Sequence, residues 1–474
     1  MIEPPPASFP AVDRHRGWRM AAVLVLVALA ARGLALGNPV IHSDEQFYFA
    51  VAHGWWRGAL PYVDIWDRKP IGLFLLYLPA AALADPQVGV FAYQLLALAA
   101  AVATAWLIAL VARENGWRGG ALPAAILYLL WLDLADGQGG QAPVLYNAAT
   151  ALAALLVSRA RGRRRHGLAA MALVGLALQI KYSVVFEGAW FGLWLLREDR
   201  GAWPGRLGYA LALVATAALP TLAAAATYLV IGEGRAWWFA NIVSILERGS
   251  APPAEQIGNL ATCVAILLVP VGLAVVGQAG SPRRPDRFLH GWLAAALIGF
   301  VAFGTWFDHY TLPVLVPAAI AAAAALERGR WRWGLLGAAA LAGQASLVAA
   351  RAGRGTPAEF AALAAAVGRA PGCLYVYAGP SMLYPFTGRC AATRFVYPSH
   401  LTRVRESGAI GVDPAAELRR LFATRPAVVV MGGAFRGEAP AIRATATTLL
   451  AAGGYRLTAV RPLGRDRLGI YTRR

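Results

Sequence analysis

Long apolar runs recur through the first 350 residues and alternate with short polar loops. A helix needs about 20 mainly apolar residues to cross a bilayer. The pattern therefore predicts eleven membrane-spanning helices, at 18–36, 87–111, 121–135, 142–157, 168–180, 183–196, 207–231, 257–277, 288–305, 311–326 and 334–350. Another run, 71–84, has only 14 residues and contains Pro79, so we expect a juxtamembrane helix there and not a further crossing.

Basic residues are distributed unequally between the predicted loops, and this orients the helices. Five loops, at 112–120, 158–167, 197–206, 278–287 and 327–333, together hold 16 arginines. Four loops on the opposite side, at 136–141, 181–182, 232–256 and 306–310, hold only Lys181, Arg235 and Arg248. Because cytoplasmic loops carry an excess of Lys and Arg, we expect a multi-pass protein of the bacterial inner membrane with a cytoplasmic N-terminus. Residues 37–70 and the chain after residue 350 then face the periplasm.

From residue 355 onward the apolar runs are shorter and alternate between helical and strand patterns. Helices are predicted at 360–370, 415–426 and 441–454, and strands at 373–379, 427–433 and 455–460. This alternation is typical of a small α/β domain. We therefore expect a polytopic α-helical membrane module at 1–350, whose outer loop 37–70 carries the active site, followed by a periplasmic α/β domain at 351–474.

Composition supports this division. The chain is 58% hydrophobic and 15% charged, with a mean hydropathy of +0.52, which excludes a disordered or ordinary soluble protein. The net charge of +19 would suggest nucleic acid in a soluble protein, but much of it lies in the arginine loops, so we expect no nucleic-acid partner. The three cysteines lack metal-ligand spacing, and no GxGxxG or P-loop motif occurs. The sequence therefore requires no cofactor and supports no metal site.

The outer loop 37–70 is the stretch richest in chemistry. Beside seven aromatic residues it holds Asp44, Glu45, Asp64 and Asp67 together with His42, His53, Arg57, Arg68 and Lys69. A loop that only connected two helices would not need such a set. The alternative for Asp64, Asp67 and Arg68 is that they make local turns and ion pairs.

Residues 44–58 of this loop are predicted to form a helix along the membrane surface. Ser43 is its expected N-cap, and Phe47, Val51 and Trp55 lie on one stripe. Asp44 then stands at the start of the helix, beside the membrane face. The alternative is that Asp44 and Glu45 only stabilise the helix through its dipole.

Lysine usage provides an independent clue. Of the 44 basic residues, only Lys69 and Lys181 are lysine. Both are expected on the periplasmic side, and Lys181 lies between two half-length helices. An ammonium at membrane depth is costly and by default marks a functional site, and a compact charge suits a phosphate oxygen. The alternative is a lysine that merely extends to the lipid headgroups.

A third polar cluster occurs at 306–317. Asp308, His309 and Tyr310 precede a helix that contains Pro313 and Pro317. Trp and Tyr at such a position are also expected as membrane-interface residues. The cluster gains weight because it is predicted on the same side as both lysines.

Together these residues resemble the GT-C superfamily of membrane glycosyltransferases, in the branch that contains protein O-mannosyltransferases and the lipid A aminoarabinose transferase. The matching positions are Asp44, Glu45, Tyr48, Gly58, Pro61, Tyr62, Lys69 and Pro70 in the outer loop, then His309, Tyr310 and Pro317, and the segment 377–398. Two positions depart from the aminoarabinose branch: Ile71 replaces a second proline, and Phe47 replaces an arginine. The sugar is therefore left open.

The resemblance implies transfer of a hexosyl or pentosyl group from a polyprenyl-phosphate donor to a hydroxyl of a lipid, glycan or protein at the outer membrane face. Asp44 is the expected general base, with Glu45 second, and direct displacement would invert the anomeric centre. Lys69, Lys181, His309 and Tyr310 are expected to bind the donor phosphate. The further substrate-binding candidates are Tyr48, Arg57, Tyr62, Asp64 and Asp67.

Two other functions fit parts of the sequence. In a transporter or flippase of a lipid-linked or anionic envelope substrate, the broken helices and Lys181 would line a path through the membrane. However, the polar residues cluster at one face, and no inverted repeat is visible. An envelope-assembly protein that only binds a glycan would leave the loop 37–70 unexplained. We therefore favour the enzyme.

Overall fold

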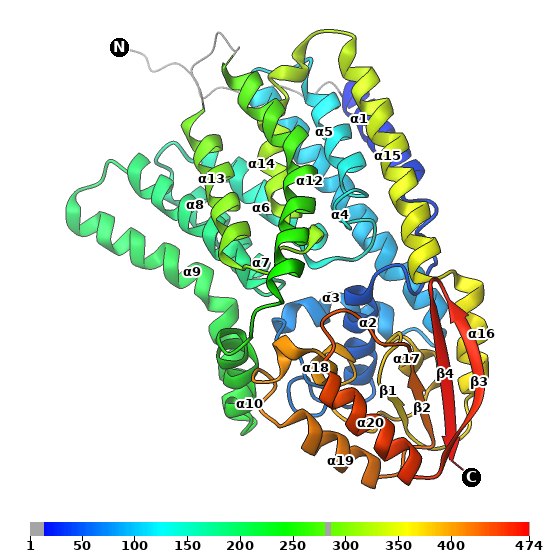
Figure 1. The fold of residues 1–474 in the computed structure, drawn as a ribbon. Helices are drawn as coiled ribbons and strands as arrows, with labels where there is room; N and C mark the ends of the chain where they lie inside the picture. The colour runs from blue at the N-terminus through cyan, green and yellow to red at the C-terminus, as the bar shows by residue number, and fades with distance from the viewer. Residues whose placement is uncertain (1–13, 280–285, 474) are drawn as a thin grey trace, which may run out of the picture.

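The structure is a computed structural model that describes residues 14–279 and 286–473. A bundle of helices forms one part of the molecule, and a small sheet with its helices packs against one end of the bundle (Figure 1). The bundle helices are α1 (Arg14–Arg32), α4 (Pro86–Glu114), α5 (Ala121–Trp131), α6 (Ala142–Ala160), α7 (Arg164–Leu178), α8 (Val185–Glu198), α9 (Trp203–Val230), α12 (Pro253–Ala279), α13 (Arg287–Ala302), α14 (Leu312–Ala322) and α15 (Trp331–Arg354).

A helix therefore overlaps each of the eleven ranges predicted to span the membrane. Among the described residues, five helical stretches are long and apolar enough to cross a bilayer: α4, α6, α9, α12 and the stretch Trp331–Val367 that begins with α15. The chain is thus a multi-pass membrane protein. Most of the predicted loop 278–287 lies outside the described residues.

Two short helices of the outer region, α2 (Ser43–Trp56) and α3 (Ile71–Ala81), lie between the bundle and the C-terminal domain (Figure 1). The prediction of Ser43 as the N-cap of α2 is wrong. His42 has extended backbone angles (φ −146°, ψ 136°), and its ring accepts the N–H of Asp44, so His42 is the cap. Phe47 and Val51 are buried, as the predicted stripe requires.

Helices α7 and α8 are separated by a break at Lys181. The backbone of Lys181 is extended (φ −158°, ψ 128°), and a single 3₁₀ turn, η1 (Tyr182–Val184), leads into α8. A similar turn, η3 (Asp308–Tyr310), precedes α14. Before α12 the chain instead forms a short helix, α10 (Gly234–Trp238) and α11 (Ser244–Leu246) joined by the π-helical segment η2 (Phe239–Val243). Non-helical backbone at membrane depth is tolerated only where protein or water surrounds it.

The C-terminal domain contains a four-stranded mixed sheet with strand order β1-β2-β4-β3. Its strands are β1 (Leu374–Val376), β2 (Val428–Met431), β3 (Tyr455–Leu463) and β4 (Asp466–Arg473), and its helices are α16 (Pro357–Val367), α17 (Leu383–Thr387), α18 (Ser399–Thr402), α19 (Pro414–Ala423) and α20 (Pro440–Ala452). Only β1 and β2 are parallel. Strand β4 was not among the predicted strands. It carries charges at both ends, and it becomes a central strand by pairing with β2 and β3.

The two faces of this sheet have different neighbours. Val376, Val430 and Ile470 belong to a core that continues into the helix bundle. On the other face, Trp66 from the outer loop is buried with Tyr375, Phe395 and other residues of the domain. The loop 37–70 is therefore held between the bundle and the C-terminal domain. A disulfide, Cys373–Cys390, joins the start of β1 to the segment that follows α17.

Candidate active site

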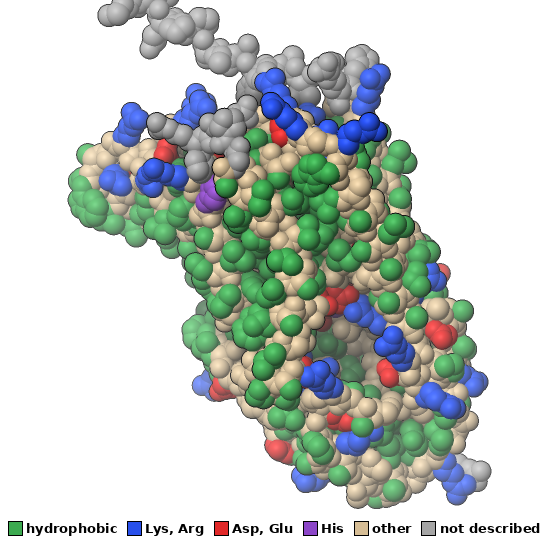
Figure 2. Space-filling model, turned by 45° about the horizontal axis from the view of Figure 1, so that its top comes forward, with side chains coloured by type: hydrophobic (Ala, Val, Ile, Leu, Met, Phe, Trp, Pro, Cys, Tyr) green, Lys and Arg blue, Asp and Glu red, His purple; other side chains and the backbone are tan. Residues whose placement is uncertain are grey.

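A cavity of about 640 Å³ lies where the bundle, the outer loop and the C-terminal domain meet. Figure 2 shows it as a hollow with acidic and basic side chains on its rim. The loop 37–70, the break at Lys181, the segment Phe307–Tyr310, the end of α15 and the C-terminal domain all contribute to its walls. On the C-terminal side, the loops that follow β1 and β2 present Gly379, Gly432 and Gly433. Without side chains there, the cavity has room for a bulky ligand.

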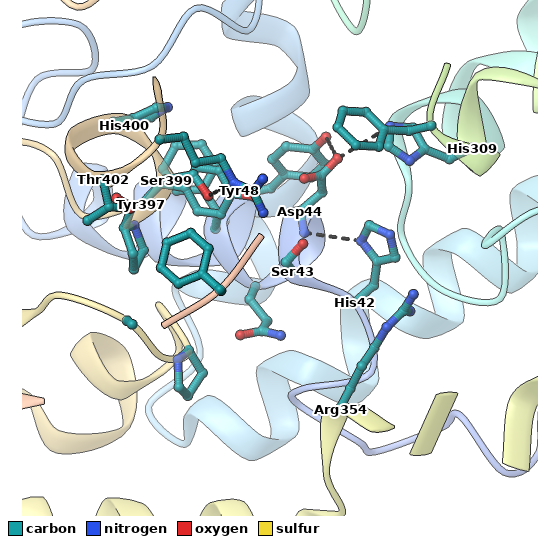
Figure 3. Close-up of a pocket in the computed structure, with 18 of the residues that line it drawn as sticks. His42, Ser43, Asp44, Tyr48, His309, Arg354, Tyr397, Ser399, His400 and Thr402 are labelled. Atoms are coloured by element: carbon teal, nitrogen blue, oxygen red, sulfur yellow. Dashed lines mark hydrogen bonds and ion pairs between the residues drawn. The ribbon is translucent and has the colours of Figure 1, made fainter. Parts of the chain in front are cut away.

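Asp44 lies in this cavity, between Tyr48 and His309 (Figure 3). Tyr48 donates its hydroxyl to Oδ2 of Asp44 at 3.3 Å, and Nε2 of His309 lies 3.7 Å from the same oxygen. Burial lowers the pKa of His309 to about 3, although the Asp44 carboxylate opposes this shift. His309 is therefore a neutral imidazole at neutral pH.

Asp44 itself is ionised. Burial alone would raise its pKa, but the nearby His309, His42, Lys69 and Lys181 outweigh burial and lower the pKa below its usual range. Because His309 is neutral, the lasting attraction comes from the two ammonium groups. The carboxylate is 19% exposed and faces the cavity, so it is free to accept a proton from a bound ligand.

Positive groups gather on the wall beside Asp44. Nζ of Lys181 lies 4.3 Å from the centre of the Tyr310 ring, and Nζ of Lys69 lies 6.0 Å from that of Tyr48. Burial lowers the pKa of Lys181 to about 8, and the charges of Lys69 and Arg248 add to this shift. Burial alone would raise the pKa of Tyr310, but the positive charges of Arg248, Lys181 and Lys69 outweigh burial and lower this pKa to about 8. This wall would gain stability from a bound anion.

Arg248 is a cavity residue that the sequence does not single out. It follows α11, and its Nε donates to Glu406 of the C-terminal domain at 2.9 Å. Arg68 contacts the other Glu406 oxygen at 2.6 Å. In the sequence, Arg248 is one of only three basic residues in four loops of the predicted periplasmic side, which could have marked it, but no spacing connects it to Lys69 or Lys181. Only the packing of its loop against the domain brings it to the cavity.

The structure brings together seven of the eleven site residues that the sequence proposes. The residues that line the cavity are Asp44, Tyr48, Asp67, Lys69, Lys181, His309 and Tyr310. Asp67 also lies 3.5 Å from His400 and so connects the outer loop to the C-terminal domain. The other four residues, Glu45, Arg57, Tyr62 and Asp64, do not line it.

These four residues lie outside the cavity, either in contacts that hold the outer loop or on the surface. Glu45 is fully buried and accepts the N–H of Gly140 at 2.6 Å, and burial raises its pKa to about 7. Asp64 accepts the N–H of Leu60 in a local turn, and the buried Tyr62 donates its hydroxyl to the carbonyl of Lys69. Arg57 is exposed at the end of α2. Glu45, Tyr62 and Asp64 thus shape the outer loop.

Within residues 14–279 and 286–473, no group of three or more His, Cys, Asp or Glu side chains is suited to hold a metal ion. The cavity is instead lined by the carboxylates of Asp44, Asp67, Asp136 and other acidic residues, by the ammonium groups of Lys69 and Lys181, and by several guanidinium and imidazole groups. Such a set suits proton acceptance next to an anion.

The comparisons with known proteins were made at the level of sequence and of structure. No family model and no curated protein matches the sequence. Among solved structures, the chain is similar to ArnT from Cupriavidus metallidurans bound to undecaprenyl phosphate, with a TM-score of 0.65 and 16% identity over 97% of this chain and 98% of that chain. It is similar to the same ArnT in the apo state, with a TM-score of 0.64 and 15% identity over the same shares. ArnT is the lipid A aminoarabinose transferase, a GT-C enzyme. The resemblance seen in the sequence is thus confirmed at the level of the fold, and the chain has a GT-C fold like that of ArnT over nearly its whole length.

Proposed function

We propose that this protein is a glycosyltransferase that moves a sugar from a polyprenyl-phosphate donor to an acceptor hydroxyl at the outer face of the bacterial inner membrane. The observation that carries the proposal is the pairing, in one cavity, of an ionised carboxylate with two ammonium groups, Lys69 and Lys181, that form no ion pair with an acidic side chain in the described part of the chain. The shared fold supports it, because one of the similar ArnT structures is bound to undecaprenyl phosphate.

The cationic wall is the proposed site of the donor phosphate. When the bond between the sugar and the phosphate breaks, negative charge develops on the departing phosphate oxygen. Lys69, Lys181 and Arg248 stand ready to stabilise that charge, with the Tyr310 hydroxyl beside them. His309, being neutral, is better suited to hydrogen bonding than to charge neutralisation.

Asp44 is the proposed general base. The acceptor hydroxyl oxygen attacks the anomeric carbon, its proton passes to the Asp44 carboxylate, and polyprenyl phosphate leaves with the electrons of the broken bond. Attack from the side opposite the phosphate inverts the anomeric centre. The acceptor, a lipid, glycan or protein, would occupy the part of the cavity next to Gly379, Gly432 and Gly433.

In this proposal the N-terminus is cytoplasmic and the C-terminal domain periplasmic, as the distribution of arginines predicts. Residues 1–350 form the membrane module and 351–474 the outer domain. The boundary falls within α15, whose last residue, Arg354, reaches the cavity. Cysteine labelling from the periplasmic side should modify a cysteine placed in the C-terminal domain and spare one placed at 158–167. Labelling of the 158–167 site from outside would reverse the orientation.

The decisive experiment compares two classes of donor. Purified protein in lipid nanodiscs receives the same labelled hexoses and pentoses either on a polyprenyl phosphate or on a nucleotide, together with an envelope extract as the source of acceptor. We expect label to be transferred from the lipid donor alone. Transfer from a nucleotide sugar in the absence of lipid carrier would contradict the proposal, and so would binding without any transfer.

A further inference from the structure

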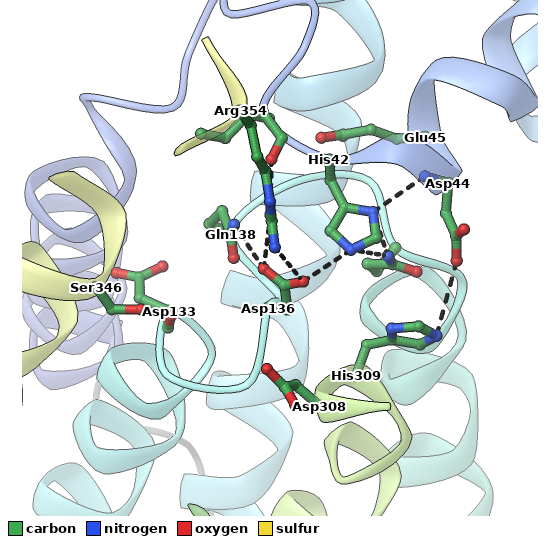
Figure 4. A network of polar contacts seen from close by, with 12 residues as sticks. His42, Asp44, Glu45, Asp133, Asp136, Gln138, Asp308, His309, Ser346 and Arg354 are labelled. Carbon is green, nitrogen blue, oxygen red and sulfur yellow. Dashed lines mark hydrogen bonds and ion pairs between the residues drawn. The ribbon is translucent and has the colours of Figure 1, made fainter. Parts of the chain in front are cut away.

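The start of α2, which carries Asp44, is attached to the rest of the protein through the side chain of His42. His42 is 5% exposed and lies between Asp44 and Asp136 (Figure 4). Its Nδ1 accepts the backbone N–H of Asp44 at 3.1 Å, and its Nε2 lies 3.0 Å from Oδ2 of Asp136. One imidazole therefore joins the helix that presents Asp44 to a turn more than ninety residues away in the chain.

The hydrogen-bond partners determine which ring nitrogen of His42 carries the proton. A backbone N–H can only donate, so Nδ1 must offer its lone pair to Asp44. Nε2 then carries the hydrogen and donates it to the Asp136 carboxylate. The Gln141 amide nitrogen lies 2.6 Å from Nδ1 and 2.8 Å from Nε2, so it restrains the ring but does not distinguish its two nitrogens. The ring is thus fixed in both orientation and tautomer.

Asp136 is in turn held rigidly. Arg354, the last residue of α15, donates to both of its carboxylate oxygens, at 2.8 and 2.7 Å, and Gln138 donates to one of them at 3.1 Å. The same guanidinium donates to the carbonyl of Ile41 at 2.8 Å, next to His42. Asp136 keeps this position although its φ of +58° lies in the left-handed region, which L residues rarely adopt. Strain retained at such a point is typical of functional sites.

An N-cap alone would not need this arrangement. Ser, Thr, Asp and Asn are the usual caps, and their side chains end at the cap. A histidine in this place offers a second nitrogen that extends the connection to Asp136 and Arg354. Glu45, the next residue in the helix, is separately held by Gly140 from the same turn as Asp136. Asp44, through His42, and Glu45, directly, are thus both attached to the segment 136–141.

We infer that His42 is a positioning residue for the transfer reaction, because its imidazole holds the backbone of Asp44 at the distance from the cationic wall that the reaction requires, while Asp136 and Arg354 hold the imidazole. The inference rests on the proposed function of Asp44 as the base. A catalytic group displaced by about 1 Å can lose about a hundredfold in rate. His42 makes no hydrogen bond to the Asp44 carboxylate, so it acts on the rate chiefly by holding the backbone of Asp44 in position.

Two amide substitutions separate the two contacts of the ring. In His42→Asn, Oδ1 takes the place of Nδ1 and can still cap Asp44, but the contact to Asp136 is lost. In His42→Gln, the longer amide can still reach Asp136, but the cap is lost. His42→Ala removes both contacts, and His290→Ala, a partly buried histidine at the start of α13 away from the cavity, is the matched control.

The first measurement is hydrogen exchange of residues 43–50 in nanodiscs, which requires no substrate. We expect exchange of the first turn of α2 to be about fivefold faster in His42→Ala and His42→Gln than in the wild type, and intermediate in His42→Asn, which keeps the cap but loses the contact to Asp136. Equal exchange in all four proteins would overturn the inference. So would faster exchange spread evenly through α4 and α14, because it would mean a general loss of stability.

The second measurement is turnover with the lipid-linked donor. We expect kcat to fall about a hundredfold in His42→Ala and His42→Gln, with donor KM within about threefold of the wild type, and His42→Asn to recover only part of the rate because it loses the contact to Asp136. A raised KM with unchanged kcat would make His42 a binding residue and overturn the inference. Equal rescue by Gln and Asn would do the same. If the wild type transfers no sugar from any lipid donor, the proposed function fails, whereas the exchange data still decide whether His42 holds Asp44.

Discussion

The two walls of the cavity differ in how their charged side chains are paired. In the described part of the chain, Lys69 and Lys181 form no ion pair with an acidic side chain within 4.0 Å, so the cationic wall has a surplus of positive charge. Asp136, which lines the other wall, is tied by hydrogen bonds to Arg354, whereas Glu45, which does not line the cavity, accepts the N–H of Gly140. Asp44 is the exception, because its carboxylate has only Tyr48 and His309 as close partners.

This difference in charge pairing indicates which wall should bind an anion and which should orient the base. A buried cation surplus is unfavourable in the empty protein and becomes favourable when an anion enters. The acidic wall has no such surplus, because its charges are already compensated, so it can orient a base without taking part in binding. The two walls should therefore respond differently to mutation: changes on the acidic wall should reduce kcat, and changes on the cationic wall should weaken donor binding.

The largest effect is expected for Asp44→Asn. The amide keeps the shape and can accept the Tyr48 hydroxyl, but it cannot take a proton from the acceptor. We expect kcat to fall by about 10²- to 10⁴-fold, while binding of undecaprenyl phosphate, measured by native mass spectrometry, remains. Turnover near the wild-type rate would place the base elsewhere.

The next effect is expected for Lys181→Met, which removes a cation but keeps the length of the side chain. We expect kcat/KM for the lipid donor to fall about a hundredfold, mainly through donor binding. Lys181→Arg and Lys69→Arg should recover only part of this loss, because a guanidinium is larger and planar where a compact ammonium fits. Full activity of both arginine variants would mean that the wall needs only positive charge.

The cationic wall should also respond to pH. Lys181 is charged below its pKa of about 8 and loses its charge as the pH rises through that value, and Tyr310, with a pKa of about 8, gains negative charge in the same range. Both changes weaken anion binding. We expect kcat/KM to decline by about tenfold or more per pH unit above 8, with Asp44 ionised throughout. In Lys181→Arg the decline should be shallower, and a decline of unchanged steepness would assign it to other groups.

The smallest effect is expected for Glu45→Gln, which tests the other member of the acidic pair. Because Glu45 is buried away from the cavity, kcat should stay within about threefold of the wild type. Burial raises the pKa of Glu45 from 4.5 to about 7, so its contribution to stability is full below 4.5 and is lost as the pH rises toward 7. Tm of the Gln variant should therefore be equal or higher at pH 8, with no such gain at pH 5. A loss of turnover like that of Asp44→Asn would make Glu45 a catalytic group.

Most of the fold could be predicted because its signals are local. A run of apolar residues long enough for a bilayer must become a helix wherever it occurs, since unpaired backbone groups are not tolerated in lipid. The predicted ranges accordingly all contain helices, and the break at Lys181 lies where the apolar run is interrupted. Strand β4 escaped prediction although it forms a hairpin with β3 directly before it in the chain, and its central place in the sheet depends on β2, which is distant in sequence.

In the candidate site, too, some residues could be selected from the sequence and others only from the tertiary structure. Residue type and side of the membrane were sufficient to select Asp44, Lys69, Lys181 and His309, because a costly polar group at a membrane face stands out in an apolar sequence. The sequence by itself could not separate Asp44 from Glu45. They are neighbours in the chain, but successive residues of a helix point about 100° apart, and only packing decides which of them faces the cavity.

Tertiary structure alone decided the remaining parts of the site. Arg248 and Arg354 are two of 42 arginines, and Asp136 lies in a glycine-rich turn with no motif. They become part of the site because the outer loop 37–70 is held between the bundle and the C-terminal domain, which brings segments hundreds of residues apart within hydrogen-bond distance. Electrostatic forces and hydrogen bonds depend on these distances in space, and the sequence specifies them only through the complete fold.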